Sequence, residues 1–219
     1  MLFFNRENRF LISLFLSFLV GFVLFMISKN YLESFAILKE IKIILNRFSL
    51  SFILVGLVLT FLFFHKKVTW YNAWPNWKNP IVLSFHTIHV FWFWIIGMVM
   101  NGIVYMVIIV QRDVENLPSL FWFCLLFSLI NAIMEEVIWR GILLSTLKKH
   151  TSTCYAIFVT SVGFGLLHLA IGFSFFLSLL ISLAGVIYAI LTLKTNSIYP
   201  SIIFHFVINI GMVLSGLII

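Results

Sequence analysis

Among the polar side chains within the apolar runs of the second half of this 219-residue sequence, six could do chemistry: Glu135, Glu136, Arg140, His168, His205 and Asn209. An ionisable side chain at membrane depth costs at least about 2.5–3.5 kcal/mol on insertion scales, so each of the five ionisable residues is a functional hypothesis. A carboxylate, two imidazoles and a carboxamide can together activate a water, stabilise an oxyanion or bind a metal ion. These residue types therefore predict a hydrolytic or metal-binding site.

Helical spacing assigns different tasks to the two adjacent carboxylates. Neighbouring residues of a helix point about 100° apart, whereas residues four apart share a face. Glu136 can therefore pair with Arg140, while Glu135 lies on another face, in an apolar setting that suits a general base. The same spacing places Phe164 over His168.

Depth along the helices provides an independent test of a common site. We assume that the helices alternate in direction and count 1.5 Å per residue from the side that carries Lys148. Glu135 then lies about 20 Å deep, His168 about 22 Å, His205 about 12 Å and Asn209 about 18 Å. The four side chains come from three helices and fall in one layer.

Simpler structural interpretations exist for each residue alone. Glu136 and Arg140 can be a pair that only holds its helix against neighbours, and an isolated histidine can be a packing residue. The shared depth favours function. His86 and His89, three apart, would share a helical face and could bind metal; without a nearby carboxylate we expect an interfacial role. Nothing marks Cys124 as a reactive thiolate.

The composition places the chain in lipid. Apolar residues make up 63% and charged residues 10% of the sequence, against roughly 45–50% and about 25% in soluble domains. This excludes a soluble globular enzyme, a disordered chain and a nucleic-acid module. Because the basic residues stand between apolar runs, the net charge of +7 indicates topology signals and contact with anionic headgroups of the bilayer.

The elements that would position the site are apolar helices. We predict an all-α, polytopic transmembrane helical bundle with about seven spans plus an interfacial amphipathic helix within 38–48. The predicted spans are 10–28, 50–64, part of 81–110, 117–147, 155–170, 173–193 and 198–219. Aromatic and basic residues of 65–79 predict a belt at headgroup level. Basic residues in the loops favour an inside N-terminus, with Arg112 on the outer side.

We expect one integral membrane domain with two parts. Residues 1–116 would form an N-terminal transmembrane region, and residues 117–219 a catalytic core. The short motifs of several intramembrane proteases are missing from the core. There is no His-Glu-x-x-His or Gly-x-Ser-x-Gly string, and a single aspartate, Asp113, excludes a two-aspartate protease.

Three motifs in order carry a family resemblance. Residues 135–140 read Glu-Glu-x-x-x-Arg, residues 164–168 read Phe-x-x-x-His, and residues 205–209 read His-x-x-x-Asn. This series resembles the CPBP family, the CAAX prenyl endopeptidase and bacteriocin-processing (Abi-type) intramembrane proteases. The resemblance covers residues 117 to the C-terminus, and the first hundred residues match no family we can name.

The resemblance implies roles for these residues. Glu135, with His168, would activate a water for attack on a peptide carbonyl, and His205 and Asn209 would stabilise the oxyanion. Glu136, Arg140 and Phe164 would orient the site. If the enzyme used zinc, His168 and His205 with Glu135 or Glu136 would be the ligands. Because the second and third motifs offer one histidine each and the third ends in Asn209, no single helix carries a compact ligand set, and we favour a metal-free glutamate mechanism.

The predicted function is therefore an intramembrane endopeptidase that acts on a membrane-associated peptide or (lipo)protein. By analogy we favour bacterial peptide processing or bacteriocin self-immunity, in the cytoplasmic membrane. The alternative is a non-enzymatic immunity or scaffold protein that binds a bacteriocin, a receptor or a sensor kinase. A small transporter is disfavoured because the polar groups cluster at one level. The sequence leaves the substrate and the oligomeric state open.

Overall fold

The computed structural model describes residues 5–83, 86–111 and 117–218, with only the backbone given for Leu83 and for residues 117–119. The chain forms two compact units, Met1–Thr69 and Trp70–Ile219. The predicted residues Arg112 and Asp113 lie outside the described residues. The expected division of the chain at residue 116 stays a prediction.

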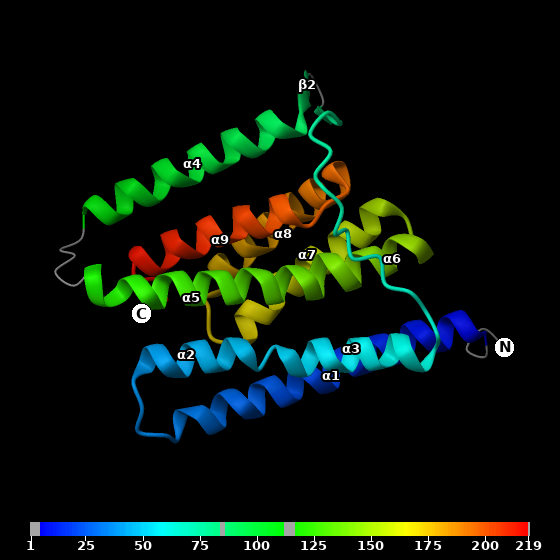
Figure 1. Ribbon diagram of the computed structural model, residues 1–219, viewed down its shortest axis with the longest axis horizontal. Coiled ribbons are helices and arrows are strands. Elements are labelled where there is room, and N and C mark those ends of the chain that lie inside the picture. Colours follow the sequence, from blue (N-terminus) through cyan, green and yellow to red (C-terminus); the bar gives the residue numbers. More distant parts are fainter. Residues whose placement is uncertain (1–4, 84–85, 112–116, 219) are drawn as a thin grey trace. The chain divides into compact units, whose positions relative to one another are not determined.

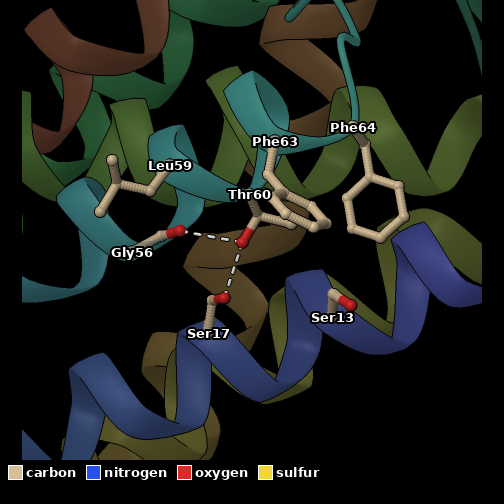
Figure 2. A pocket seen from close by; sticks show the side chains of 7 residues that line it. All are labelled: Ser13, Ser17, Gly56, Leu59, Thr60, Phe63 and Phe64. Carbon is tan, nitrogen blue, oxygen red and sulfur yellow. Dashed lines mark hydrogen bonds between the residues drawn. The ribbon is translucent and has the colours of Figure 1, made fainter.

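The first unit is a helical hairpin of α1 (Arg6–Glu33), α2 (Lys39–Phe48) and α3 (Ser51–Phe63). Small residues let α1 and α3 approach closely: a Cβ added to Gly21 would lie 2.6 Å from the Cα of Ile53. The hydroxyls of Ser17 and Thr60 hydrogen-bond across the helices at 2.6 Å. Figure 2 shows this bond in a pocket between α1 and α3, whose remaining lining is mostly apolar.

The predicted amphipathic segment is helix α2. Its polar residues Asn46 and Arg47 are buried, and the guanidinium of Arg47 donates to the Asn46 carboxamide oxygen at 2.6 Å. A short turn joins α2 to α3, and the two follow one another in Figure 1. Together, as Lys39–Phe63, they are long and apolar enough to cross a membrane.

The second unit begins with a segment, residues 70–79, that is tied to the loop between α8 (Phe175–Thr195) and α9 (Tyr199–Leu214). The backbone N–H of Ile198 donates to the carbonyl of Tyr71 at 2.8 Å, and that of Asn76 donates to Thr195 at 2.8 Å. Burial raises the pKa of the Tyr71 hydroxyl, so it stays neutral. Trp74 is 92% exposed, as an aromatic residue at a headgroup belt would be.

A β-hairpin of β1 (Pro80–Leu83) and β2 (His86–His89) precedes α4 (Val90–Val110). The strands are antiparallel, with Pro80 opposite His89. The prediction that His86 and His89 share a face is therefore wrong, because side chains three apart on a strand point to opposite faces. The Nδ1 of His89 lies 3.2 Å from the carbonyl of Lys78.

The remaining helices carry the three motifs and form a bundle (Figure 1). They are α5 (Leu117–Glu136), the π-helix η2 (Val137–Leu144), α6 (Ser145–His150), α7 (Thr153–Ala170), α8 and α9. Serine N-caps start α7 and α8: the Ser152 and Ser174 hydroxyls accept backbone N–H bonds at 3.3 Å.

The predicted fold class is confirmed. Within the described ranges, six helical stretches are long and apolar enough to cross a membrane. The seventh predicted span, 198–219, is the shorter helix Tyr199–Leu214. It ends early because Gly216 takes a positive φ of 68°, which stops the helix.

Candidate active site

The first motif lies where α5 becomes a π-helix. Glu135 and Glu136 are the last residues of α5, and Arg140 lies within η2. Such wide turns are frequent at functional sites. Two hydroxyls bond to carbonyls where η2 returns to α-helix: Ser145 donates to Gly141 at 2.7 Å, and Thr146 to Ile142 at 2.6 Å. These bonds stabilise backbone that could not be solvated by lipid.

A buried ion pair anchors this motif. Arg140 Nη1 donates to Glu136 Oε1 at 2.9 Å, and neither side chain is exposed. Arg140 Nη2 donates to the carbonyl of Gly185 on α8 at 3.0 Å. Buried charges need such pairing and hydrogen bonding because desolvation is costly.

Phe164 of the second motif lies at the centre of the site. Its ring faces the Arg140 guanidinium at 4.6 Å, a cation–π contact. It also makes edge contacts with the rings of His168 and His205, at 4.9 and 5.7 Å between centroids. One aromatic side chain of α7 thus packs against three motif residues.

His205 of α9 lies between the two carboxylates. Its Nδ1 is 3.0 Å from Glu136 Oε1, and its Nε2 is 3.7 Å from Glu135 Oε2. Because Glu136 Oε1 also accepts from Arg140, Nδ1 must be the donor to it. In the neutral ring the lone pair of Nε2 therefore faces Glu135.

His168 of α7 approaches Glu135 in the same way. Its Nδ1 lies 2.8 Å from the carbonyl oxygen of Phe164. A carbonyl can only accept, so Nδ1 carries the proton and Nε2 is the basic atom. This Nε2 lies 3.9 Å from Glu135 Oε2. The structure thus brings two imidazole nitrogens to one carboxylate oxygen, at separations too long for direct hydrogen bonds.

Asn209 is buried on α9, one turn after His205. Its Nδ2 donates to the carbonyl of Ser128 on α5 at 3.5 Å. The structure therefore places Asn209 at the α5–α9 contact, on the N-terminal side of Glu135 along α5.

The metal alternative can be tested against the donor atoms. The residue types suit zinc, and both imidazoles use Nδ1 on an acceptor, as metal-ligating histidines do. Among the residues that the structure describes, however, no group of three or more His, Cys, Asp or Glu side chains is arranged to hold a metal ion. The described geometry therefore does not fit a ready-made zinc site.

Two contributors to this site come from α8, which carries no motif. Gly185 accepts from Arg140, and the ring of Tyr188 stacks on His205 at 4.9 Å. Sequence reasoning missed both. A signal was present: Gly185, Tyr188 and Thr192 are spaced by three and four, and therefore share one face of the helix.

The fold and the site together define a class: a polytopic helical membrane protein with a buried glutamate–histidine centre. Residues 117–211 match the model of the family described as Rce1-like, type II CAAX prenyl endopeptidase Rce1-like. This match confirms the family prediction: the part of the chain that carries the motifs is similar to the Rce1-like proteins of the CPBP family. The family implies a CAAX-type protease. Neither a curated protein nor a solved structure matches the chain significantly.

Proposed function

We propose that the chain is an intramembrane endopeptidase that hydrolyses a peptide bond of a membrane-associated peptide or protein with an activated water. One observation carries the proposal: the Nε2 atoms of His168 and His205 lie 3.9 and 3.7 Å from Glu135 Oε2. A water hydrogen bond spans about 2.8 Å, so one water can bridge either imidazole and the carboxylate.

Glu135 would act as the general base. The water oxygen bonds to the substrate carbonyl carbon while its proton passes to Glu135, and the carbonyl oxygen becomes an oxyanion. When the tetrahedral intermediate collapses, the C–N bond breaks and Glu135 returns the proton to the leaving amine. His168 accepts the second water hydrogen at Nε2 and orients the water.

His205 would stabilise the oxyanion as an imidazolium, a form that it reaches by taking a proton from solvent before the attack and leaves by returning that proton after the product departs. In its neutral form Nε2 can only accept, so donation to the oxyanion requires the imidazolium form. Glu136 favours that form because it accepts the Nδ1 proton of His205, and Arg140 in turn holds Glu136. Asn209 would add a neutral donor.

The biological role is a finer proposal. The family name points to prenylated CAAX proteins as one substrate class, and peptide processing or bacteriocin self-immunity in a bacterial cytoplasmic membrane is the role we favour by analogy. All of these substrates share one property: they present a cleavable peptide bond to a membrane-embedded site.

Comparing new peptide termini between cells that make the wild type and the Glu135→Gln variant tests the proposal. Mass spectrometry of the membrane proteome should detect termini that need Glu135. The matched control is Glu33→Gln, because the Glu33 side chain is 65% exposed in the first unit. If no terminus depends on Glu135 while Glu135→Gln is folded, the endopeptidase proposal is overturned.

The phenotypes of active-site variants distinguish the endopeptidase from the non-enzymatic alternative. An immunity or scaffold protein that binds a bacteriocin, a receptor or a sensor kinase would keep its phenotype in Glu135, His168 and His205 variants. An endopeptidase loses its phenotype in all three.

A further inference from the structure

Helix α8 presents one buried face to the proposed active site. Gly185, Tyr188 and Thr192 lie on this face. Gly185 accepts from Arg140 at 3.0 Å. Thr192 and the hydroxyl of Ser201 on α9 lie 2.7 Å apart, one turn before His205.

Tyr188 is the residue of this face that contacts the reacting layer. Its ring is 1% exposed and is stacked on the His205 imidazole, with 4.9 Å between centroids and 16° between planes. The Arg140 guanidinium lies 5.0 Å from the centre of the same ring. Tyr188 therefore touches the two residues that Glu136 joins by hydrogen bonds, and the four side chains form a closed ring of contacts.

The backbone holds Tyr188 in register with His205. The hydroxyl of Ser201 donates to the Tyr188 carbonyl at 2.8 Å. Ser201 and His205 are four apart and share a face of α9. The stacked rings of Tyr188 and His205 thus lie one helical turn from the hydrogen bonds that Ser201 makes between α8 and α9.

We propose that Tyr188 is a positioning residue that fixes the plane of the His205 imidazole and so aims its Nε2 at Glu135; this inference rests on the proposed endopeptidase function. The hydrogen bond from Nδ1 to Glu136 fixes one atom of the ring but leaves rotation about that bond. A flat aromatic surface parallel to the imidazole removes this rotation. Arg140, the other hydrogen-bond partner of Glu136, also lies against the Tyr188 ring. The tyrosine ring therefore constrains both ends of the chain Arg140–Glu136–His205.

Two variants separate the ring from its hydroxyl. Tyr188→Phe keeps the stacked surface, and Tyr188→Leu removes it. The control Phe127→Leu removes another buried aromatic from a stacked pair, Phe123 with Phe127, on α5 of the same unit. It reports the effect of lost aromatic packing without a change at His205.

Steady-state cleavage of a fluorogenic farnesylated CAAX peptide gives the first readout. Tyr188→Leu should lower kcat by about 10²-fold, the effect of a misplaced reacting group, with KM unchanged. Tyr188→Phe and Phe127→Leu should keep most of the wild-type kcat. Tyr188→Leu with wild-type kcat overturns the inference.

The second readout does not need a substrate. Nuclear magnetic resonance of ¹⁵N-histidine-labelled protein in micelles should show the Nδ1–H tautomer at His205 in the wild type and in Tyr188→Phe, and an averaged tautomer in Tyr188→Leu. A His205→Gln sample assigns the signal. An unchanged His205 spectrum in Tyr188→Leu refutes the positioning role even if the peptide is not cleaved. Cleavage by Glu135→Gln at the wild-type rate would instead refute the proposed function.

Discussion

Arg140 and Glu136 form an ion pair 2.9 Å long at the α5–η2 junction, with no exposed surface on either side chain. Because the pair is also bonded to Gly185 of α8 and His205 of α9, it joins three helices at one point. This arrangement predicts that the two charges depend on one another for stability.

Removing one partner of the pair should be far more harmful than removing both. Arg140→Met leaves a buried carboxylate and should lower the free energy of unfolding by about 3–5 kcal/mol. The double variant Glu136→Leu with Arg140→Met should recover most of this loss yet stay inactive, because His205 loses its acceptor. Titration with SDS in mixed micelles measures the unfolding.

The partly exposed pair Lys42–Glu33 is the control for that experiment. Its charged atoms are 3.6 Å apart, and the Glu33 side chain is 65% exposed. Lys42→Met should change stability by only about 0–1 kcal/mol. Equal losses for Lys42→Met and Arg140→Met would contradict the assigned role of the buried pair.

The residues of the candidate site could be proposed from the sequence because charge is so rare in an apolar span. Helical spacing also anticipated that Glu136 would meet Arg140. Spacing could not predict contacts between helices. Nothing in the sequence around Tyr188 indicates that its ring packs against His205 of another helix. The prediction that His86 and His89 share a face was wrong because helical spacing was applied to residues of a β-hairpin. The π-helix η2 could not be predicted either, because it depends on local hydrogen bonds to carbonyls that the spacing of apolar residues does not reveal.

Close contact between α7 and α8 should be needed to place His168. A Cβ on Gly165 would lie 2.5 Å from the Ser178 carbonyl oxygen, which is backbone and cannot rotate away. Gly165→Ala should therefore separate the helices, cost about 1–3 kcal/mol and lower kcat, because His168 is one turn further along α7.

Gly102→Ala on α4 is the matched substitution, since a Cβ there meets nothing within 4 Å. It should raise stability by about 0.5–1 kcal/mol through lower backbone entropy in the unfolded chain. Thermal unfolding and peptide cleavage measure both variants. If Gly165→Ala behaves like Gly102→Ala, the close approach does not hold.

Asn209 should matter more for kcat than for stability. Its 3.5 Å bond to the Ser128 carbonyl is long, against a usual N–H···O distance of about 2.9–3.0 Å. The carboxamide can leave it at little cost to reach an oxyanion. Asn209→Ala should lower kcat by about 10²–10³-fold with KM nearly unchanged. Asn101→Ala, which removes a 2.8 Å bond to the Gly97 carbonyl on α4, should leave kcat intact. If Asn209→Ala lost stability but kept its kcat, the role of Asn209 would be to hold α9 against α5 and not to stabilise the oxyanion.

Cleavage should not require a bound metal ion. Three separate helices supply Glu135, His168 and His205, and the third motif ends in Asn209, whose carboxamide is a weak zinc ligand beside imidazole or carboxylate. We expect purified, active protein to contain far less than one zinc per chain by plasma mass spectrometry, and to keep its kcat after dialysis against 1,10-phenanthroline. A known zinc protease in the same micelles shows that the chelator works. Stoichiometric zinc, with activity lost on chelation and restored by zinc alone, would overturn the metal-free mechanism. A metal centre would then activate the water in place of Glu135.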